Sequence, residues 1–219
     1  MADELNNAAD GRRGFFITFE GGEGAGKSTL VQKVAANLQA QGHEVVTLRE
    51  PGGTALGENL RAILKNQHTS EPICAQAELL MMYASRVQLV NLQIKPALAR
   101  GAMVLCDRHD LSSFAYQGGG RGLPFNTINQ VRQAVLGDFT PDLTILIDVP
   151  VEVGMQRVRA RGERDRFELE QLAFFERVRR AYLQVGALLP YVKIIDGTLN
   201  EKEVAAAAWQ EICARLKER

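Results

Sequence analysis

The sequence predicts an α/β fold, in which a doubly wound parallel sheet of about five strands carries helices on both faces. Three observations predict it: short, uniformly apolar runs recur along the chain, longer segments with helical periodicity separate them, and glycine, proline or charged residues bound them. Strands that are apolar on both faces belong to parallel sheets, because helices cover both sides of such sheets. A chain of 219 residues, 46% of them hydrophobic, is long enough to bury the core of one such domain.

The predicted strands are five apolar runs of five or six residues. They are 15–19 (FFITF), 44–48 (EVVTL), 102–106 (AMVLC), 143–148 (LTILID) and 192–196 (VKIID). Helical periodicity places helices at 27–41, 57–66, 76–99 with an interruption near Pro96, 126–136, 151–161, 168–188 and 201–217. Gly42 ends the first helix, and Asn200 is a suitable N-cap for the last. The segments 20–27, 49–57, 107–122 and 160–167 are predicted to be irregular and functional.

The charge balance argues against a general attraction to polyanions. Twenty-six Lys and Arg residues balance 26 Asp and Glu residues, so we predict neither nucleic acid nor a membrane surface as a partner. No segment approaches the run of about 18 apolar residues that a membrane span needs. Residues 1–13 are polar and lack the apolar core of a signal peptide, so we expect a disordered lead before a single domain at 14–219.

The cysteines predict a reducing compartment. Cys74, Cys106 and Cys213 are odd in number, widely spaced and without a CxxC pair, which favours reduced thiols in the cytoplasm over a disulfide framework. We expect all three to be packing residues.

The segment GGEGAGKS at 21–28 fits the pattern G-x-x-x-x-G-K-[ST], follows a predicted strand and opens a predicted helix. In this context backbone N–H groups converge on phosphate oxygens, and Lys27 reaches the phosphoryl group that is transferred. The alternative is a glycine-rich turn between strand and helix, which does not account for the Lys-Ser pair. We therefore predict a bound nucleoside triphosphate. The predicted binding residues are Gly21, Gly22, Glu23, Gly24, Ala25, Gly26, Lys27, Ser28 and Thr29.

Two oxygen-bearing side chains are predicted to hold Mg²⁺ beside this loop. The Ser28 hydroxyl belongs to the phosphate-binding pattern, and Asp107 directly follows the third predicted strand. The alternative role of Asp107 is a helix or turn cap.

A phosphate loop does not by itself define an activity, because switch GTPases, ATP-driven machines and small-molecule kinases share it. A GTPase would be expected to carry an N-K-x-D-like motif after a later strand, and none of the predicted strands is followed by one. The chain also lacks G-x-S-x-G and H-E-x-x-H, so a nucleophilic or zinc hydrolase has little support.

Four motifs occur in order: GGEGAGKS at 21–28, REPGGT at 49–54, CDRHDLSSFAYQGGGRG at 106–122 and RVRARGERDRFE at 157–168. The second and third follow strands, and open α/β sheets bind ligands at the carboxyl ends of their strands. Together the motifs resemble those of bacterial thymidylate kinases, and the resemblance covers residues 14 to about 215. It implies a P-loop NTPase fold, a homodimer, and transfer of the γ-phosphoryl group of ATP to dTMP, giving dTDP and ADP.

The resemblance assigns roles to charged residues around the acceptor. It implies that Glu23 accepts a hydrogen bond from the 3′-hydroxyl of the sugar; the alternatives are a solvent-facing acid or one paired with an arginine. Arg108 clamps the phosphate that receives the transfer. Arg49 and Arg61 belong to the same group, unless they are surface or ion-pairing arginines.

The resemblance also assigns residues that read the base and the sugar. Arg86 donates to thymine O4, while Met82 stands one turn earlier, where the family has a phenylalanine that stacks on the base. Ser113 takes the place of a threonine or asparagine at the pyrimidine edge. Tyr116 crowds the 2′ position and so favours a deoxyribose, and Gln117 opens the glycine-rich stretch beside it. Core packing of Met82 and simple loop flexibility at 118–122 are the alternatives.

An arginine-rich segment at 157–168 is predicted to form a short lid. Arg157, Arg159, Arg161, Arg164 and Arg166 bracket Gly162, where the helical phase should break. The alternative is a solvated basic helix face. In the family a catalytic arginine comes from the phosphate loop or from the lid, and residues 22–25 contain none. Arg161 and Arg166 are therefore predicted to be catalytic, together with Lys27 and Arg108, and Arg157 is the next candidate in the lid.

Two other functions are kept as alternatives. One is a kinase for another nucleoside monophosphate, UMP or CMP, and the other is a nucleotide-hydrolysing switch.

Overall fold

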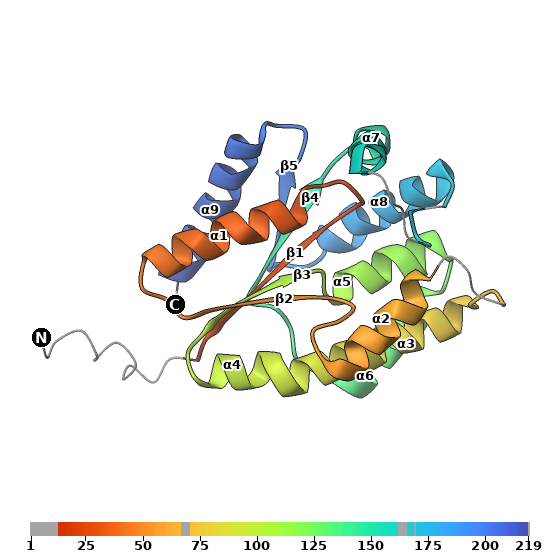
Figure 1. Ribbon diagram of the computed structural model, residues 1–219, viewed down its shortest axis with the longest axis horizontal. Helices are drawn as coiled ribbons and strands as arrows, with labels where there is room; N and C mark the ends of the chain where they lie inside the picture. Colours follow the sequence, from red (N-terminus) through yellow and green to blue (C-terminus); the bar gives the residue numbers. More distant parts are fainter. Residues whose placement is uncertain (1–12, 67–70, 162–165, 169, 219) are drawn as a thin grey trace, which may run out of the picture.

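The computed structural model describes residues 13–66, 71–161, 166–168 and 170–218. Five parallel strands form one sheet in the order β2-β3-β1-β4-β5 (Figure 1). They are β1 (Phe15–Gly21), β2 (Val45–Arg49), β3 (Met103–Asp107), β4 (Leu143–Asp148) and β5 (Val192–Asp196). In this register Phe15 of β1 lies beside Met103, and Ile17 lies beside Leu143. All five predicted strands are confirmed to within two residues.

Helices connect the strands. They are α1 (Lys27–Ala40), α2 (Ala55–Lys65), α3 (Ala75–Leu89), η1 (Val90–Ile94), α4 (Lys95–Ala99), α5 (Asp110–Ser113), η2 (Phe114–Gly120), α6 (Phe125–Leu136), α7 (Val151–Arg161), α8 (Leu172–Gly186) and α9 (Glu201–Lys217). The predicted cap of the last helix is confirmed. The Asn200 side chain accepts from the N–H groups of Lys202 and Glu203, and the Glu203 side chain accepts from the Asn200 N–H.

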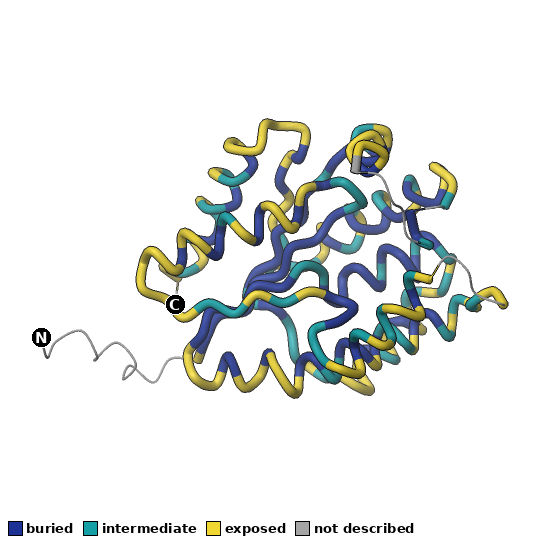
Figure 2. Tube along the Cα trace, in the orientation of Figure 1, coloured by how far each residue is buried: buried dark blue, intermediate teal, exposed yellow. Residues whose placement is uncertain are grey.

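Alternation along β1 explains why helices cover both faces of the sheet. Phe15, Ile17 and Phe19 point into a core shared with α1 and α9. Phe16 points to the opposite face, into a core shared with α3, α4 and α6. All four side chains are buried, and Figure 2 shows the central strands dark blue between helices with exposed outer faces. The predicted doubly wound parallel sheet is confirmed.

The segment 107–122 was predicted to be irregular, and this is wrong for most of the segment. Residues 110–120 are helical, first as α5 and then as the π-helical η2. Gly118, Gly119 and Gly120 serve close packing: a Cβ on Gly119 would lie 2.5 Å from the Ala181 Cβ and 2.7 Å from the Arg177 carbonyl oxygen of α8. The segment therefore forms a wall that packs closely on α8.

Two other predicted helices differ in detail. The segment 76–99 is helical throughout, because a π-helical stretch at 90–94 carries the chain into α4, where Pro96 stands in the first turn. The helix predicted from residue 168 begins at Leu172, since residues 166–168 form a turn.

Cys106 is buried and Cys213 is half-buried, but Cys74 is exposed directly before α3, so the predicted packing role is wrong for Cys74. All three thiols are free.

Within the described ranges, no helix combines the length and the apolar character needed to cross a membrane. Residues 1–12 of the predicted lead lie outside the described residues.

Candidate active site

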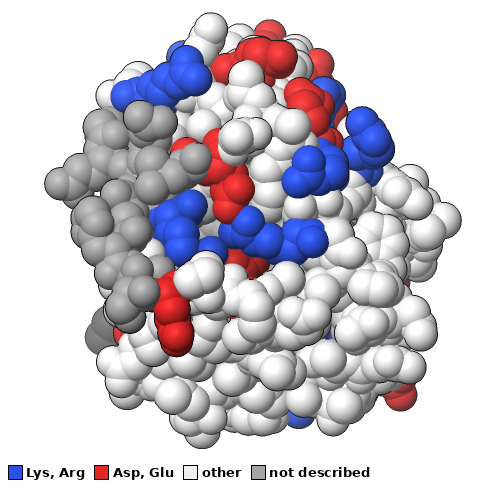
Figure 3. All heavy atoms as spheres, turned by 90° about the vertical axis from the view of Figure 1, so that its right-hand side faces the viewer, with Lys and Arg blue, Asp and Glu red and all other residues white. Residues whose placement is uncertain are grey.

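A cavity of about 430 Å³ opens outside the carboxyl ends of β1, β2 and β3, where an open α/β sheet binds its ligands. Lysine and arginine side chains gather across the middle of the face shown in Figure 3. Most of the predicted site residues line this one cavity: Glu23, Gly24, Ala25, Gly26, Lys27, Ser28, Thr29, Arg49, Arg61, Met82, Arg86, Asp107, Arg108, Ser113, Tyr116 and Gln117. Gly21 and Gly22 line a smaller cavity behind the loop.

The phosphate loop is seated on the backbone of α7. A Cβ on Gly24 would lie 2.1 Å from the Gly154 carbonyl oxygen, so only glycine permits this approach. The Lys27 ammonium donates to the Gly21 and Gly22 carbonyls, at 3.1 and 2.9 Å. Burial and the neighbouring Arg108 together lower the pKa of Lys27 to about 8. The Lys27 side chain thus folds back over the Gly21 and Gly22 carbonyls of the phosphate loop.

The two predicted magnesium ligands lie together. The Ser28 hydroxyl, in the first turn of α1, donates to Asp107 Oδ2 at the end of β3, at 2.6 Å. A hydroxyl and a carboxylate are oxygen ligands of the kind that Mg²⁺ prefers. The described residues contain no group of three or more metal-binding side chains. Mg²⁺ does not need one, since it usually keeps several waters and takes phosphate oxygens. The pair therefore fits Mg²⁺ bound beside a triphosphate.

Arg108 lies at the centre of the cavity wall. Its Nη2 donates to Glu23 Oε1 at 2.6 Å and to the Tyr116 hydroxyl at 3.1 Å. The Tyr116 hydroxyl in turn donates to Glu23 at 2.7 Å, and the guanidinium carbon lies 4.9 Å from the centre of the Tyr116 ring. Glu23 is therefore paired with an arginine, which was one of the alternatives for this residue.

Electrostatics keep Glu23 ionised. Burial by itself raises the pKa of this carboxyl, but the positive charges of Arg108 and Lys27 outweigh burial and lower the pKa to about 2. An ionised carboxylate can only accept hydrogen bonds, so it suits a sugar hydroxyl as well as a guanidinium.

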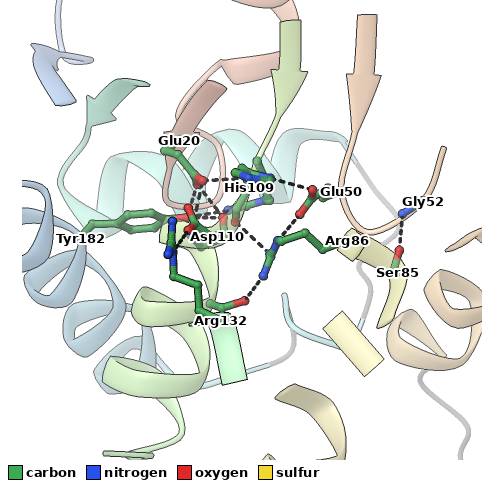
Figure 4. Close-up of polar contacts among 12 residues, drawn as sticks. Glu20, Glu50, Gly52, Ser85, Arg86, His109, Asp110, Arg132 and Tyr182 are labelled. Atoms are coloured by element: carbon green, nitrogen blue, oxygen red, sulfur yellow. Dashed lines mark hydrogen bonds and ion pairs between the residues drawn. The ribbon is translucent and has the colours of Figure 1, made fainter. Parts of the chain in front are cut away.

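Arg86 is buried in the lining of the same cavity. Its Nε donates to Glu50 Oε2 at 2.6 Å, Nη1 donates to Ser113 Oγ at 2.9 Å, and Nη2 donates to the His109 carbonyl at 2.9 Å. Figure 4 shows Glu50 between Arg86 and the His109 ring, whose Nδ1 lies 2.8 Å from Glu50 Oε1. Burial raises the pKa of Glu50, but Arg86 and His109 hold it below its usual value. Glu50 is thus an ionised carboxylate, and it orients the Arg86 guanidinium.

Sequence reasoning assigned no role to Glu50, although its place in REPGGT, after a strand, was a usable signal. It also assigned no role to Phe167 and Glu168, which line the cavity. The Phe167 ring meets Tyr116 edge to face, with centroids 6.0 Å apart. Met82 is half-buried in the cavity wall one helical turn before Arg86, as the resemblance requires.

Arg49 and Arg61 reach the cavity with partners of their own. Nη2 of Arg49 donates to both carboxylate oxygens of Glu58, at 3.0 and 2.9 Å, so Arg49 is an ion-pairing arginine here. Nη1 of Arg61 donates to the Pro51 carbonyl at 2.8 Å.

The structure separates the predicted lid arginines. Arg166 lies away from the cavity: its Nε donates to the Leu64 carbonyl at 2.8 Å, and its Nη2 donates to Glu78 Oε2 at 2.7 Å. Glu78 is fully buried and also accepts from Gln117 at 2.8 Å. Arg157 spans the carbonyls of Gly24 and Gly197, at 3.3 Å from each. The side chain of Arg161 lies outside the described residues, as do Gly162 and Arg164.

Comparison with known proteins gives two findings. A family model described as "Thymidylate kinase" matches residues 19–208. A curated protein named thymidylate kinase, from Idiomarina loihiensis (strain ATCC BAA-735 / DSM 15497 / L2-TR), is 51% identical over 191 residues, which cover 87% of this chain and 93% of that protein. The family match includes the phosphate loop from Gly21 onward and every residue that lines the cavity.

Proposed function

The chain belongs to the thymidylate kinase family, and from this premise we propose that it transfers the γ-phosphoryl group of ATP to dTMP, giving dTDP and ADP for dTTP synthesis. As a member of this family it is a nucleoside monophosphate kinase, a transferase that binds nucleotides. One observation carries the proposal: the phosphate loop, Arg108, and the pair Arg86 and Met82 all line a single cavity. The family match does not favour a UMP or CMP kinase or a hydrolysing switch.

On the donor side, backbone N–H groups of Gly21–Thr29 cradle the triphosphate of ATP. The Lys27 ammonium exchanges its two loop carbonyls for phosphate oxygens, which are stronger partners because they are charged. Ser28 and Asp107 would hold Mg²⁺, which would neutralise negative charge on the phosphates.

On the acceptor side, Arg108 holds the phosphate of dTMP, with Arg49 and Arg61 contributing positive charge at the same wall. The incoming phosphate competes with Glu23 for Nη2 of Arg108, so Glu23 is released toward the 3′-hydroxyl of the sugar. The acceptor oxygen then lies in line with the γ-phosphate, and no covalent enzyme intermediate is needed.

The hydrogen-bond donors of Arg86 and the shape of the cavity select the base. Arginine has five N–H groups, and Glu50, Ser113 and the His109 carbonyl occupy three of those of Arg86. A remaining N–H donates to thymine O4 and finds no acceptor in the amino group of cytosine. Met82 covers the face of the base, Ser113 and Gln117 bound its edge, and Tyr116 closes the space beside the 2′ carbon.

The lid contributes the positive charge over the transferred group. We assign this role to Arg161, with Arg166 as a second candidate that must leave Glu78 to reach the phosphates.

The enzyme is proposed to act as a homodimer in the cytoplasm. Exposed apolar side chains support the dimer: Leu80 of α3, Leu92 of η1 and Val135 of α6 are 58%, 55% and 40% exposed, and α3 packs on α6.

A panel of monophosphates with MgATP tests the function. ADP formation is measured with dTMP, dUMP, UMP and CMP, and the highest kcat/KM is expected for dTMP. Preference for a ribonucleotide would reject the roles of Tyr116 and Arg86. Phosphate release at the same rate with and without dTMP would instead support a hydrolysing switch.

A further inference from the structure

The backbone at Arg108 adopts a conformation that its side chain disfavours. Among the described residues, Arg108 is the only one other than glycine with a positive φ, at 73°. A side chain with a Cβ is strained in this region, so the conformation persists only where the surroundings fix it. One restraint is the Arg108 N–H, which donates to the Phe19 carbonyl of β1 at 2.9 Å.

The neighbouring Glu20 supplies a second restraint. Glu20 is fully buried in β1, and its Oε1 accepts from the backbone N–H of His109 at 2.7 Å and from that of Ser112 at 3.3 Å (Figure 4). It thereby fixes the chain immediately after Arg108. Burial raises the pKa of this carboxyl. Both donors at Oε1 are backbone N–H groups, so this contact persists whether the carboxyl is charged or neutral.

The other oxygen of Glu20 reaches the guanidinium through two hydroxyls. Oε2 accepts from Ser112 Oγ at 2.6 Å and from the Tyr182 hydroxyl at 3.0 Å. The same two hydroxyls accept from Arg108 Nη1, at 3.4 and 3.0 Å. Glu20 therefore acts on both ends of Arg108, on the backbone directly and on the guanidinium through Ser112 and Tyr182.

We propose that Glu20 is a positioning residue for Arg108, which it fixes in the left-handed conformation and points toward the acceptor phosphate. The two guanidinium nitrogens then have different tasks. Nη2 is paired with the partly accessible Glu23 and exchanges this partner for the phosphate. Nη1 is held by the buried Ser112 and Tyr182 hydroxyls and keeps its place. Glu20 does not line the cavity. This role rests on the proposed function of Arg108.

Three variants separate positioning from general stabilisation. Glu20→Ala removes all four contacts, whereas Glu20→Gln keeps an oxygen for the two backbone N–H groups. Thr18→Val is the matched control: Thr18 is buried two residues earlier on the same face of β1, and its hydroxyl lies 2.7 Å from the Thr144 hydroxyl, away from Arg108. Each variant is assayed for ADP formation over a range of dTMP and ATP concentrations.

We expect Glu20→Ala to lower kcat/KM for dTMP about tenfold or more, because the Arg108 guanidinium, a charged donor, is no longer held in position. The KM for ATP should change less than about twofold. Glu20→Gln stays within about threefold of the parent, and so does Thr18→Val. In an Arg108→Ala background, Glu20→Ala adds less than about twofold, since both changes act on one interaction. Equal losses for Glu20→Ala and Thr18→Val, or an undiminished loss in the Arg108→Ala background, would overturn the proposal.

Two further measurements keep the test decisive. Should Glu20→Ala not fold, Tyr182→Phe deletes one hydroxyl between Glu20 and Arg108, and an about threefold loss of kcat/KM for dTMP is expected. Amide hydrogen exchange at residues 109 and 112 uses no substrate: Glu20→Ala speeds it at least about tenfold, and Thr18→Val leaves it unchanged. If wild type fails to phosphorylate dTMP, the proposed function fails, while the exchange result still decides whether Glu20 fixes the chain at Arg108.

Discussion

At the scale of single residues, three acids at the cavity wall or behind it are paired with arginines. Glu23, Glu50 and Glu78 each contact an arginine that lies far away in the sequence. Each pair is held at the cavity wall or behind it, where burial penalises an isolated charge. The carboxylates therefore fix arginine positions before any nucleotide binds.

Glu23 gives the protein a measurable sensitivity to acid. Its pKa is lowered from 4.5 to about 2, so its stabilising contribution is complete above pH 4.5 and is lost as the pH falls toward 2. Between pH 6 and pH 3 this group alone should remove about 2 kcal/mol from the free energy of unfolding. Urea denaturation at the two pH values should show this part of the loss in wild type and not in Glu23→Gln.

The control is Glu58→Gln, which breaks an exposed pair with Arg49 and should leave the pH dependence closer to that of wild type. Identical acid sensitivity of wild type and Glu23→Gln would contradict the ion pair with Arg108.

At the scale of elements, the wall behind the acceptor site depends on the close approach of η2 and α8. Arg177 of α8 donates to the Gly119 and Gly120 carbonyls, at 3.3 and 2.9 Å, and Gly119 leaves no room for a Cβ. The wall carries Tyr116 and Gln117, so its packing sets the width of the cavity.

We expect Gly119→Ala to destabilise the protein by about 1–3 kcal/mol in urea denaturation, because a methyl group is forced against the α8 backbone. Gly22→Ala is the matched control for stability, since nothing lies within 4 Å of a Cβ at that position. Its loss should stay below about 1 kcal/mol. Equal losses in the two variants would contradict the packing explanation.

The proposed lid is tested by replacing both candidate arginines. Arg161→Met combined with Arg166→Met should lower kcat about 10³-fold or more, as for other arginines that stabilise phosphoryl transfer, with less effect on dTMP affinity. The single variant Arg166→Met should also lose about 1–3 kcal/mol of unfolding free energy, because buried Glu78 loses a charged donor. Full turnover in the double variant would remove both residues from the mechanism.

At the scale of the whole molecule, the sheet order places three strand ends around one cavity. β1 lies between β3 and β4, so the phosphate loop after β1 faces Asp107 and Arg108 after β3, while β2 brings Arg49 and Glu50 to the same edge. The helices α3 and α6 cover one face of the sheet, and α1 and α9 cover the other (Figure 1).

Assembly is the prediction that belongs to this scale. If α3, η1 and α6 form the dimer contact, then Leu80→Glu with Leu92→Glu should convert the dimer to a monomer in size-exclusion chromatography with light scattering. Leu188→Glu is the control, since Leu188 is 78% exposed at the turn between α8 and β5. It should leave the dimer intact, and a wild-type monomer would reject the homodimer.

The sequence predicted what local patterns encode. Apolar runs located every strand, and the glycine spacing with Lys27 and Ser28 located the phosphate loop, because strand burial and phosphate binding depend on residues that are neighbours in the chain. The helices α5 and η2 were missed, since Gly118–Gly120 have low helix propensity and tertiary packing, mainly on α8, favours the helix.

Family resemblance named most of the residues that line the cavity, but their partners were decided only by the tertiary structure. Glu23 and Arg108 are 85 residues apart in sequence, Arg86 and Glu50 are 36 apart, and Glu20 and Tyr182 are 162 apart. No local pattern fixes such pairs. They form because the parallel sheet brings distant strand ends to one edge, where buried charges and hydroxyls must find partners in whatever segment packs against them.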